Sequence, residues 1–406
     1  MLSILFMVFA AMTTAPEGVV VNSDYWDAAS YDFKFDWILT KRVAASSDRN
    51  FLLTPLGLQL ALALLTEAAT GDTQTELTSV LGFDLDRKLV RKKFANIIES
   101  LQEESPDYNL RLGSSIYVSD DAQVRPRFVA VAKEFYKCEL KNVNFHNPAV
   151  ASKEINGWVS NITQENISSV DEDDVANMVM LVLNSLYIRG IWSNQFLRTA
   201  TKLGTFYVSP TVQKTVPFMT VKDKFYYIES SKYDAKILKM PYRGEKYAMY
   251  IIVPNSLTGL PRVLNDLSDL SFTRYLREYQ VDVTLPKFKF DYTLQLDGVL
   301  RELGIRSAFD VTASFPGIAR GQLLDQRPMV SKVLQRSSIE VNELGSVTNS
   351  PTWLLPENKT GEDTEATAEV VANRPFLFFI QDEATRQLLF TGRVADPSLA
   401  DGAFKL

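Results

Sequence analysis

The sequence predicts an α+β fold. Helix-like segments fill most of the first third of the chain, and strand-like segments dominate its last half. Strands and helices do not alternate regularly, so a doubly wound parallel sheet is not expected. With 406 residues, 46% of them hydrophobic and 23% charged, the chain has enough apolar material for a large core. No stretch of linker composition separates two patterned halves, and we therefore expect one large domain.

The predicted helices are marked by apolar residues that recur every three or four positions. They span residues 35–43, 54–71, 125–136 and 151–164. The second is apolar nearly all round, begins with Thr54 and Pro55 and ends at Gly71, which predicts a helix buried on all sides. In the fourth, Ile155, Trp158 and Val159 are expected to face inward.

The predicted strands are rich in β-branched and aromatic residues. They span residues 110–119, 179–188, 247–254, 281–290, 376–380 and 387–394. Because these segments follow one another without a helix between most of them, we expect mixed or antiparallel sheets.

The net charge excludes two classes of partner. At −6, the chain has no general attraction to phosphate backbones or to anionic membrane surfaces. We therefore expect neither nucleic acid nor a membrane as a partner. The one basic cluster, at residues 87–93, spaces its charges along a predicted helix among Leu89, Val90 and Phe94. A solvated helix face is the favoured interpretation, and a polyanion site is the alternative.

The first fifteen residues form an apolar run of signal-peptide length that ends in small residues and is too short to span a bilayer. We predict a signal peptide at residues 1–15, secretion to the extracellular space, and a mature domain over residues 16–406. The run carries no Lys or Arg at its start, so a buried N-terminal segment stays open as the alternative.

Cysteine and asparagine positions bear on that prediction. Cys138 is the only cysteine, so no intramolecular disulfide can form, and we expect it to be a buried structural thiol. Three N-x-S/T sequons are candidates for glycosylation if the chain is secreted: Asn161, Asn166 and Asn358.

The sequence offers no set of catalytic residues. His146 is the only histidine, which excludes histidine-based zinc motifs and leaves a Ser-His-Asp triad with one possible member. It lies in a turn-like "FHNP" stretch, where an exposed histidine without a catalytic role is the expected outcome. The acidic run at 171–174 has no spaced ligand set around it. We predict no enzymatic activity, no metal and no cofactor.

The most unusual segment is residues 342–371, which separate a strand-like "SSIEV" from the apolar "NRPFLFFI". A largely polar segment of about thirty residues between two sheet-forming segments is uncommon in a compact domain, where loops of that length are usually functional or disordered. This segment therefore decides what can be said about function.

Six segments together resemble the serpin family, in the order in which the family has them. They are residues 50–83, 155–167, 181–196, 283–305, 330–346 and 373–397. The third includes Asn184, Tyr187, Gly190, Trp192 and Phe196 where serpins have them. The resemblance implies three β-sheets, eight or nine helices and an exposed reactive-centre loop at about residues 344–371. It also implies inhibition by insertion of the cleaved loop into the main sheet while the protease is still attached. We expect a monomer.

Within this loop the resemblance assigns a hinge and a reactive bond. Glu343, Gly345 and Ser346 match the family's hinge, with Leu344 in place of a second glutamate. Counting from the hinge leads to the bond between Lys359 and Thr360. Because Lys359 is the only basic residue between Glu343 and Arg374, a target protease is expected to be trypsin-like, with an acidic pocket for lysine.

Loop insertion requires alternate side chains to enter the core of the sheet. The hinge set of small residues, Ser346, Thr348, Ser350 and Thr352, suits the inward face. Pro351 does not suit a central strand, because it has no N–H and crowds a neighbour, and Trp353 is bulky. We therefore predict a poor or non-inhibitory serpin that acts on a non-protease ligand or protein. The alternative is a working suicide inhibitor of a trypsin-like serine protease.

The resemblance also marks the region where the main sheet opens. It comprises Thr54, Asn184, Trp192 and Gln335. Gln335 stands where serpins often have a histidine, so the hydrogen-bond network expected with Thr54 and Asn184 is altered. A glycan on Asn358 would obstruct a protease at the neighbouring reactive bond.

Overall fold

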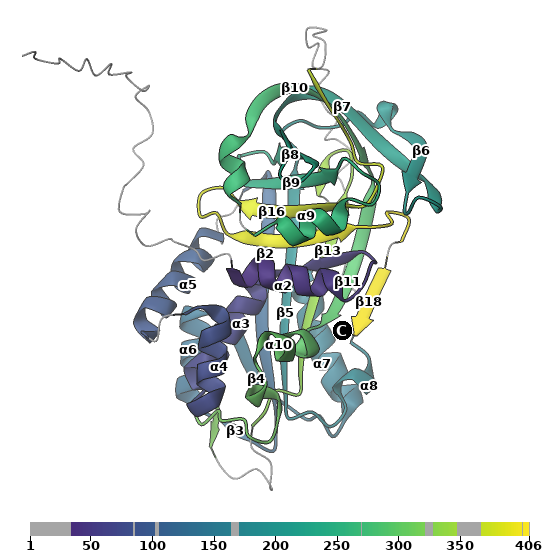
Figure 1. Cartoon of the computed structure of the whole chain (residues 1–406). Coiled ribbons are helices and arrows are strands. Elements are labelled where there is room, and N and C mark those ends of the chain that lie inside the picture. Colours follow the sequence, from purple (N-terminus) through teal and green to yellow (C-terminus); the bar gives the residue numbers. More distant parts are fainter. Residues whose placement is uncertain are drawn as a thin grey trace, which may run out of the picture. The chain divides into compact units, whose positions relative to one another are not determined.

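Two large β-sheets with helices packed around them make up the described part of the protein (Figure 1). The computed structural model describes residues 34–83, 86–101, 105–163, 170–268, 270–320, 328–346, 367–399 and 401–405. Within these residues there are nine α-helices and a mixture of parallel and antiparallel strands, which confirms the α+β class.

The α-helices and short 3₁₀ helices are distributed along the whole described chain. The α-helices are α2 Lys34–Ala45, α3 Pro55–Ala68, α4 Gly71–Leu81, α5 Arg87–Leu101, α6 Pro126–Phe135, α7 Pro148–Thr163, α8 Glu172–Val175, α9 Leu260–Asp266 and α10 Asp297–Leu303. The 3₁₀ helices are η1 Arg198–Ala200, η2 Ser271–Tyr275 and η3 Ser307–Phe309. The four helices predicted from periodicity correspond to α2, α3, α6 and α7.

A nine-stranded sheet occupies the upper part of the view in Figure 1. Its path runs β1-β17-β16-β9-β8-β7-β10-β15, and β6 also pairs with β7. The bounds are β1 Phe51–Leu53, β6 Lys202–Tyr207, β7 Gln213–Ser230, β8 Ala235–Pro241, β9 Tyr247–Pro254, β10 Arg277–Pro286, β15 Ala368–Val371, β16 Phe376–Asp382 and β17 Leu388–Val394. All its pairings are antiparallel except that of β10 with β15.

A seven-stranded sheet, called the main sheet below, runs in the order β18-β11-β13-β14-β5-β2-β4. Its strands are β2 Tyr108–Ser119, β4 Cys138–Val143, β5 Met180–Ile191, β11 Phe288–Gln295, β13 Lys332–Val341, β14 Gly345–Ser346 and β18 Asp401–Lys405. A small third sheet pairs β3 Gln123–Val124 with β12 Ala319–Arg320.

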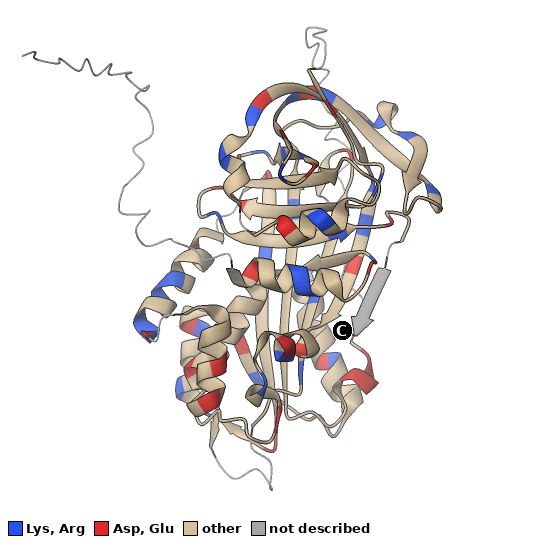
Figure 2. Ribbon diagram, viewed as in Figure 1, with Lys and Arg blue, Asp and Glu red and all other residues tan. Residues whose placement is uncertain are grey.

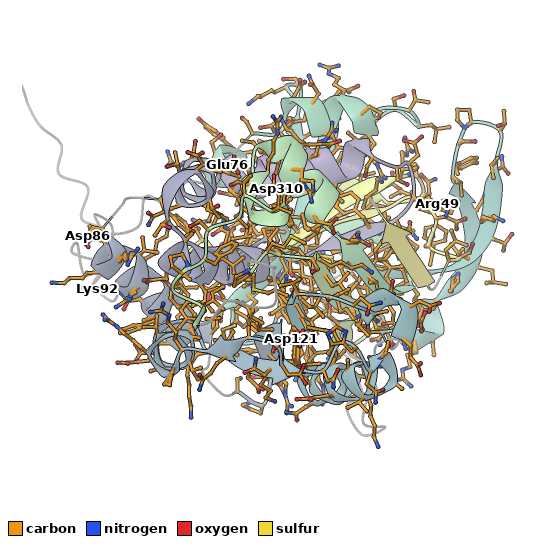
Figure 3. The ribbon with its side chains drawn as sticks, turned by 90° about the horizontal axis from the view of Figure 1, so that it is seen from below. Arg49, Glu76, Asp86, Lys92, Asp121 and Asp310 are labelled. Atoms are coloured by element: carbon orange, nitrogen blue, oxygen red, sulfur yellow. The ribbon has the colours of Figure 1, made fainter. Side chains whose placement is uncertain are left out.

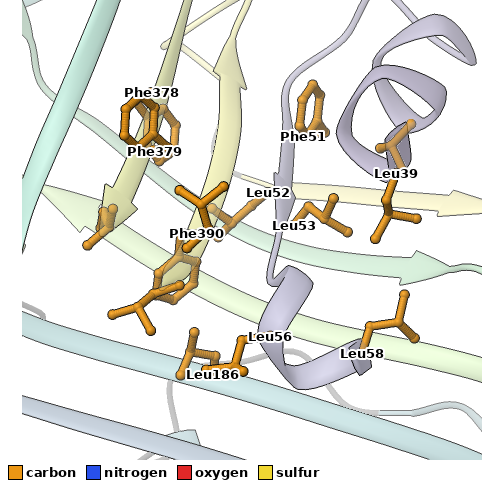
Figure 4. Close-up of a cluster of buried hydrophobic side chains, with 14 of the residues drawn as sticks. Leu39, Phe51, Leu52, Leu53, Leu56, Leu58, Leu186, Phe378, Phe379 and Phe390 are labelled. Atoms are coloured by element: carbon orange, nitrogen blue, oxygen red, sulfur yellow. The ribbon is translucent and has the colours of Figure 1, made fainter. Parts of the chain in front are cut away.

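Helix α3 lies in the core, as its apolar composition predicts. Leu56, Leu58 and their neighbours are fully buried, and they pack with β1 and with Phe378, Phe379 and Phe390 of the nine-stranded sheet (Figure 4). The predicted end at Gly71 is wrong, because α3 stops at Ala68 and the next two residues are extended. Gly71, with φ of 60°, is instead the first residue of α4.

Helix α7 covers the face of the main sheet that points away from the central core. Ile155, Trp158 and Val159 are buried, as predicted, and pack on Leu181 and Leu183 of β5. The segment after α7 is tied to it, since Ser152 Oγ donates to the Val170 carbonyl at 2.8 Å. The lower half of β5 is therefore enclosed by helices on one side and by the core on the other.

The predicted signal peptide and much of the predicted loop lie outside the described residues. Among the helices that are described, none has both the length and the apolar character needed to cross a bilayer.

Candidate functional site

The main sheet forks between β5 and β13, and the hinge of the predicted loop lies in the fork. Lower in the sheet the two strands pair directly in parallel, from Lys332 opposite Leu181 to Ser338 opposite Tyr187, which is seven residue pairs. Above that point β14 lies between them, antiparallel to both strands. Leu344, expected at the start of the exposed loop, is instead buried along with Gly345 and Ser346.

Gly345 occupies a position that only glycine fits. Its φ of 156° is unfavourable for other residues. A Cβ at this position would lie 1.9 Å from the carbonyl oxygen of Gly190, a backbone atom that cannot move aside cheaply. The glycine thus allows the chain to pass close enough to β5 to pair with it.

Ser346 enters the core and meets two stacked aromatic rings. Its hydroxyl lies 2.7 Å from the Tyr242 hydroxyl, and the Tyr242 ring stacks on Trp192 with centroids 4.5 Å apart. Burial raises the pKa of Tyr242, so this hydroxyl stays protonated. Trp192 holds the hinge by two further bonds, from its indole Nε1 to the Asn342 carbonyl at 3.1 Å and from its backbone N–H to the Leu344 carbonyl at 2.8 Å.

Glu343 anchors the hinge electrostatically. Its buried carboxylate accepts hydrogen bonds from Thr201 Oγ1 at 2.8 Å and from Lys287 Nζ, which lies 2.9 Å from one carboxylate oxygen and 3.1 Å from the other. Burial by itself raises the pKa of Glu343, but the bonds from Lys287, Thr201 and the backbone outweigh it and leave the pKa below its ordinary value. The carboxylate is therefore ionised at neutral pH.

The seven direct pairs of β5 with β13 are called the seam below. Of the predicted sheet-opening residues, Thr54, Asn184 and Gln335 lie around its middle, whereas Trp192 lies in the fork above it. Asn184 and Gln335 are directly opposite each other on β5 and β13. Thr54 Oγ1 donates to Asn184 Oδ1 at 3.3 Å, whereas the Gln335 amide donates to Ser337 Oγ at 3.2 Å and to the Leu52 carbonyl at 3.5 Å. Asn184 Nδ2 and Gln335 Oε1 are buried and have no hydrogen-bond partner. This central pair of the seam thus holds one unused donor and one unused acceptor.

The segment after α7 is fastened to the lower end of the same seam. Lys332 Nζ donates to the Asp174 carbonyl at 2.7 Å and lies 3.4 Å from its carboxylate. The Val170 backbone exchanges two hydrogen bonds with the Asn156 side chain, at 2.6 Å and 3.0 Å. The acidic run at 171–174 thus forms α8 and its start, and within the described residues no cluster of three or more His, Cys, Asp or Glu could hold a metal ion.

Several predicted site residues lie outside the described residues. They are Asn166, Thr348, Ser350, Pro351, Asn358, Lys359 and Thr360. Asn161 is described and exposed, near the end of α7.

Cys138 and His146 are placed as the sequence predicts. Cys138 is buried, and burial raises the pKa of its thiol, so it is not a ready nucleophile. His146 is exposed and its Nε2 lies 3.0 Å from Asp121 Oδ2, a hydrogen bond that raises the pKa of the imidazole. Neither residue contacts the hinge.

The basic cluster on α5 is an exposed helix face (Figure 2). Arg91 is neutralised by a bidentate bond to Glu67, with distances of 2.7 Å and 2.9 Å. Asp86, just before the helix, and Lys92 lie at the outer edge of the molecule when it is seen from below (Figure 3). A cleft of about 680 Å³ beside the helix is lined by Arg87, Arg125 and Arg127 among others. These contacts agree with a solvated face.

Three residues that hold the hinge were not predicted as site residues: Thr201, Lys287 and Tyr242. Thr201 follows η1, Lys287 lies between β10 and β11, and Tyr242 follows β8. All three are therefore far from Glu343 in sequence. No local pattern distinguishes them from other surface or core residues, and only the packing of the sheets brings them together.

The comparisons with known proteins cover nearly the whole chain. A sequence model of the family described as "Serpin (serine protease inhibitor)" matches residues 29–397. Serine protease inhibitor 2 of Anopheles gambiae is 34% identical over 376 residues, which cover 90% of this chain and 91% of that protein. The structure of Serpin48 from the insect Tenebrio molitor is similar with a TM-score of 0.79 at 28% identity, covering 93% of this chain and 100% of that one.

Human thyroxine-binding globulin, solved in complex with thyroxine, is also similar. Its TM-score is 0.82 at 23% identity, over 92% of this chain and 100% of that one. At 23% identity this comparison supports the fold alone.

The Gly345→Ala variant tests whether the hinge needs glycine. Because the new Cβ would overlap the Gly190 carbonyl, we expect β14 to leave the sheet or to destabilise it by about 1–3 kcal/mol. Amide hydrogen exchange at Trp192, whose N–H donates to Leu344, should become faster. The matched control is Gly157→Ala on an exposed turn of α7, where a Cβ meets nothing within 4 Å and should be harmless or stabilising. Unchanged exchange at Trp192 would contradict the assignment.

The Glu343→Gln variant tests the ionic anchor through its pH dependence. The folded-state pKa of Glu343 is lowered, so its stabilisation is complete above the ordinary value of 4.5 and is lost as the pH falls through the lowered value. We expect the variant to lose about 1 kcal/mol of stability at pH 7 and nothing in strong acid. Thermal unfolding from pH 7 to well below pH 3 measures this difference. Glu340→Gln, which removes the longer and more exposed pair of Glu340 with Lys289 at 3.9 Å, should show a smaller effect. A gap between wild type and Glu343→Gln that persists below pH 3 would refute the anchor.

Proposed function

Because this chain belongs to the serpin family, whose members generally inhibit serine proteases, we propose that it is a secreted serpin that inhibits poorly or not at all. Its domain spans residues 16–406, and its reactive-centre loop is cut as a substrate more often than it traps the protease. Its role is then the binding of a non-protease ligand or protein. Inefficient insertion follows from the register in which the hinge enters the main sheet.

The register of β14 can be continued residue by residue into the seam. Gly345 lies opposite Ile191 on β5, so continuation brings Pro351 opposite Ser185 and Trp353 opposite Leu183. On the other side Ser346 lies opposite Val341 of β13, so the same continuation brings Trp353 opposite Leu334. This register supports the proposal, because it assigns each loop residue a neighbour whose surroundings are described.

In this register the inserted strand would separate β13 from β5, and Pro351 would lie within that strand. In a central strand each N–H is bonded to one neighbour or the other, so proline removes one ladder bond whichever side it faces. By analogy with helix interiors the cost is about 3 kcal/mol. Since each ~1.4 kcal/mol in a barrier changes a rate tenfold, this cost is enough to let deacylation overtake insertion in most encounters.

Trp353 would face the cluster beneath α7. Leu183 and Leu334 are both buried there, packed with Ile155 and Trp158. Adding an indole ring to a packed cluster displaces its members, and overpacking of this kind costs about 1–3 kcal/mol. Insertion past this point therefore requires α7 to move away from the sheet, against the bonds of Val170 and Asp174 that hold its following segment.

One observation favours the second candidate, a functional inhibitor. The hinge already lies in the sheet, and continuing its register brings Thr352 between Asn184 and Gln335, whose unused donor and acceptor a hydroxyl could satisfy. Small Thr348 and Ser350 would likewise face the core. An inhibitor with this loop would present Lys359 to the acidic pocket of a trypsin-like protease.

Secretion is supported by the apolar run at residues 1–15 and by the exposed position of Asn161, where a glycan could attach. A glycan on Asn358 would further reduce access of a protease to the Lys359–Thr360 bond.

The balance between substrate and inhibitor is tested by replacing the two disruptive residues. We expect the wild-type chain, incubated with trypsin, to be cut after Lys359 with little SDS-resistant complex. The double variant Pro351→Ala, Trp353→Ala should shift the ratio of complex to cleaved chain by at least tenfold, because it removes both costs. Gel densitometry gives the ratio, and mass spectrometry locates the cut. Pro356→Ala is the matched control, since the same register brings Pro356 to Met180 at the end of β5, where a missing N–H matters less.

Two outcomes would reject the proposal. One is a wild-type chain that already forms mostly stable complex, which would establish the inhibitor instead. The other is a cut at a site other than Lys359, which would remove the assigned reactive bond.

A further inference from the structure

The outer edge of the main sheet is covered by the last described strand. On its inner side β11 pairs with β13 along all eight of its residues, from Phe288 opposite Val341 to Gln295 opposite Leu334. On its outer side β18 pairs with it in parallel, from Asp291 opposite Asp401 to Gln295 opposite Lys405. Figure 1 shows β18 as the outermost strand of this sheet, beside the C-terminal label.

The chain between β17 and β18 is directed toward this edge by a turn that is hydrogen-bonded to Asn50. After β17, the backbone N–H groups of Ala395 and Asp396 donate to Asn50 Oδ1 at 2.7 Å and 2.8 Å, and Asn50 Nδ2 donates to the Asp396 carbonyl at 2.7 Å. Asp396 Oδ1 then accepts from the backbone N–H and the hydroxyl of Ser398, at 2.9 Å and 2.6 Å. The Asn50 carbonyl also accepts the Tyr292 hydroxyl of β11. One buried asparagine thus joins the turn to the strand that β18 covers.

Without β18, β11 would be an eight-residue edge strand. Its outward N–H and C=O groups over residues 291–295 would lose their partners, and such an edge is a template for strand addition. The strand contains no proline, and its exposed side chain is Lys289. A parallel strand of five residues bonded on one side only is a weak cover, since parallel pairing is slightly less stable per residue than antiparallel pairing.

We propose that the β11 edge is a strand-accepting surface that residues 401–405 occupy within the same chain, and that its other occupant is β11 of a second copy. Two β11 strands paired antiparallel about a two-fold axis are self-complementary in their backbone bonds. A register centred on Phe290 also sets Lys289 of each copy opposite Asp291 of the other, a favourable cross-strand charge pair. The tail therefore keeps the chain monomeric by filling this edge. The inference concerns the outer edge of the sheet and does not depend on whether the loop inserts.

The test compares the full chain with a variant that ends at Leu399. Sedimentation velocity over a range of concentrations should show a monomer for the full chain and a dimer, at least tenfold tighter, for the shortened one. Lys289→Glu in the shortened chain sets a carboxylate opposite Asp291 and should weaken the dimer at least tenfold. Because Lys289 also pairs with Glu340 at 3.9 Å, we expect a small loss of stability, and thermal unfolding of this variant is measured alongside to show that it folds. A synthetic peptide of residues 397–406 added to the shortened chain should restore the monomer, and a scrambled peptide should not.

Proline substitutions in the full chain test the same surface if the shortened chain unfolds. Successive N–H groups of a strand point to opposite edges, so one of Gly402→Pro and Ala403→Pro removes a bond to β11 and the other does not. We expect faster hydrogen exchange at residues 291–295 in one of the two variants only. The proposal is overturned if the shortened chain folds and stays monomeric. It is equally overturned if neither proline variant changes exchange at β11.

Discussion

The parallel pairing of β13 with β5 is the contact on which the main sheet depends. Seven residue pairs close the sheet along this seam, and β14 already separates the same two strands above it. A strand inserted along the seam exchanges one parallel pairing for two antiparallel pairings, each slightly more stable per residue. On backbone pairing alone, such an insertion would be favourable, and the barrier to it would be set by what must move. The hinge, the seam and α7 are the parts of that barrier.

The seam contains buried polar atoms that have no hydrogen-bond partner. Asn184 and Gln335 meet midway along it with one buried donor and one buried acceptor unused, and each such atom costs about 1–3 kcal/mol. In the upper fork the opposite holds, because Ser346, Glu343 and the Trp192 indole all have partners there. The buried polar groups therefore have hydrogen-bond partners where the hinge has entered the sheet, and some of them lack partners where it has not. This gradient would favour insertion, and Pro351 and Trp353 are the residues that we propose oppose it.

Local pattern was enough to predict some of the elements, but not the contacts that set the state of the hinge. The apolar run of α3 and the inward face of α7 are read directly from periodicity, because burial dictates which residues such helices contain. The end of α3 was misplaced because a glycine can start a helix after a positive φ as readily as it can end one. Glu343, Gly345 and Ser346 were identified by resemblance, yet their burial depends on Lys287, Thr201 and Tyr242, which no local pattern connects to them. The β18 strand could not be predicted either, because its five residues lack the apolar alternation of a buried strand, and backbone bonds to β11 define it.

The main sheet can gain a strand in two places, and the physical chemistry of the two differs. Adding a central strand is slow, because the seven pairs of the seam must first separate. The addition is hard to reverse, because a central strand is bonded on both sides and buried on both faces. An edge strand such as β18 is bonded on one side only, so it can leave without disturbing the rest of the sheet. The same backbone chemistry therefore gives an exchangeable contact at β11 and a committed one between β5 and β13. Covering the edge matters most while the centre is opening, because a sheet whose strands are separating offers unpaired groups at several positions, and a second copy could pair with any of them.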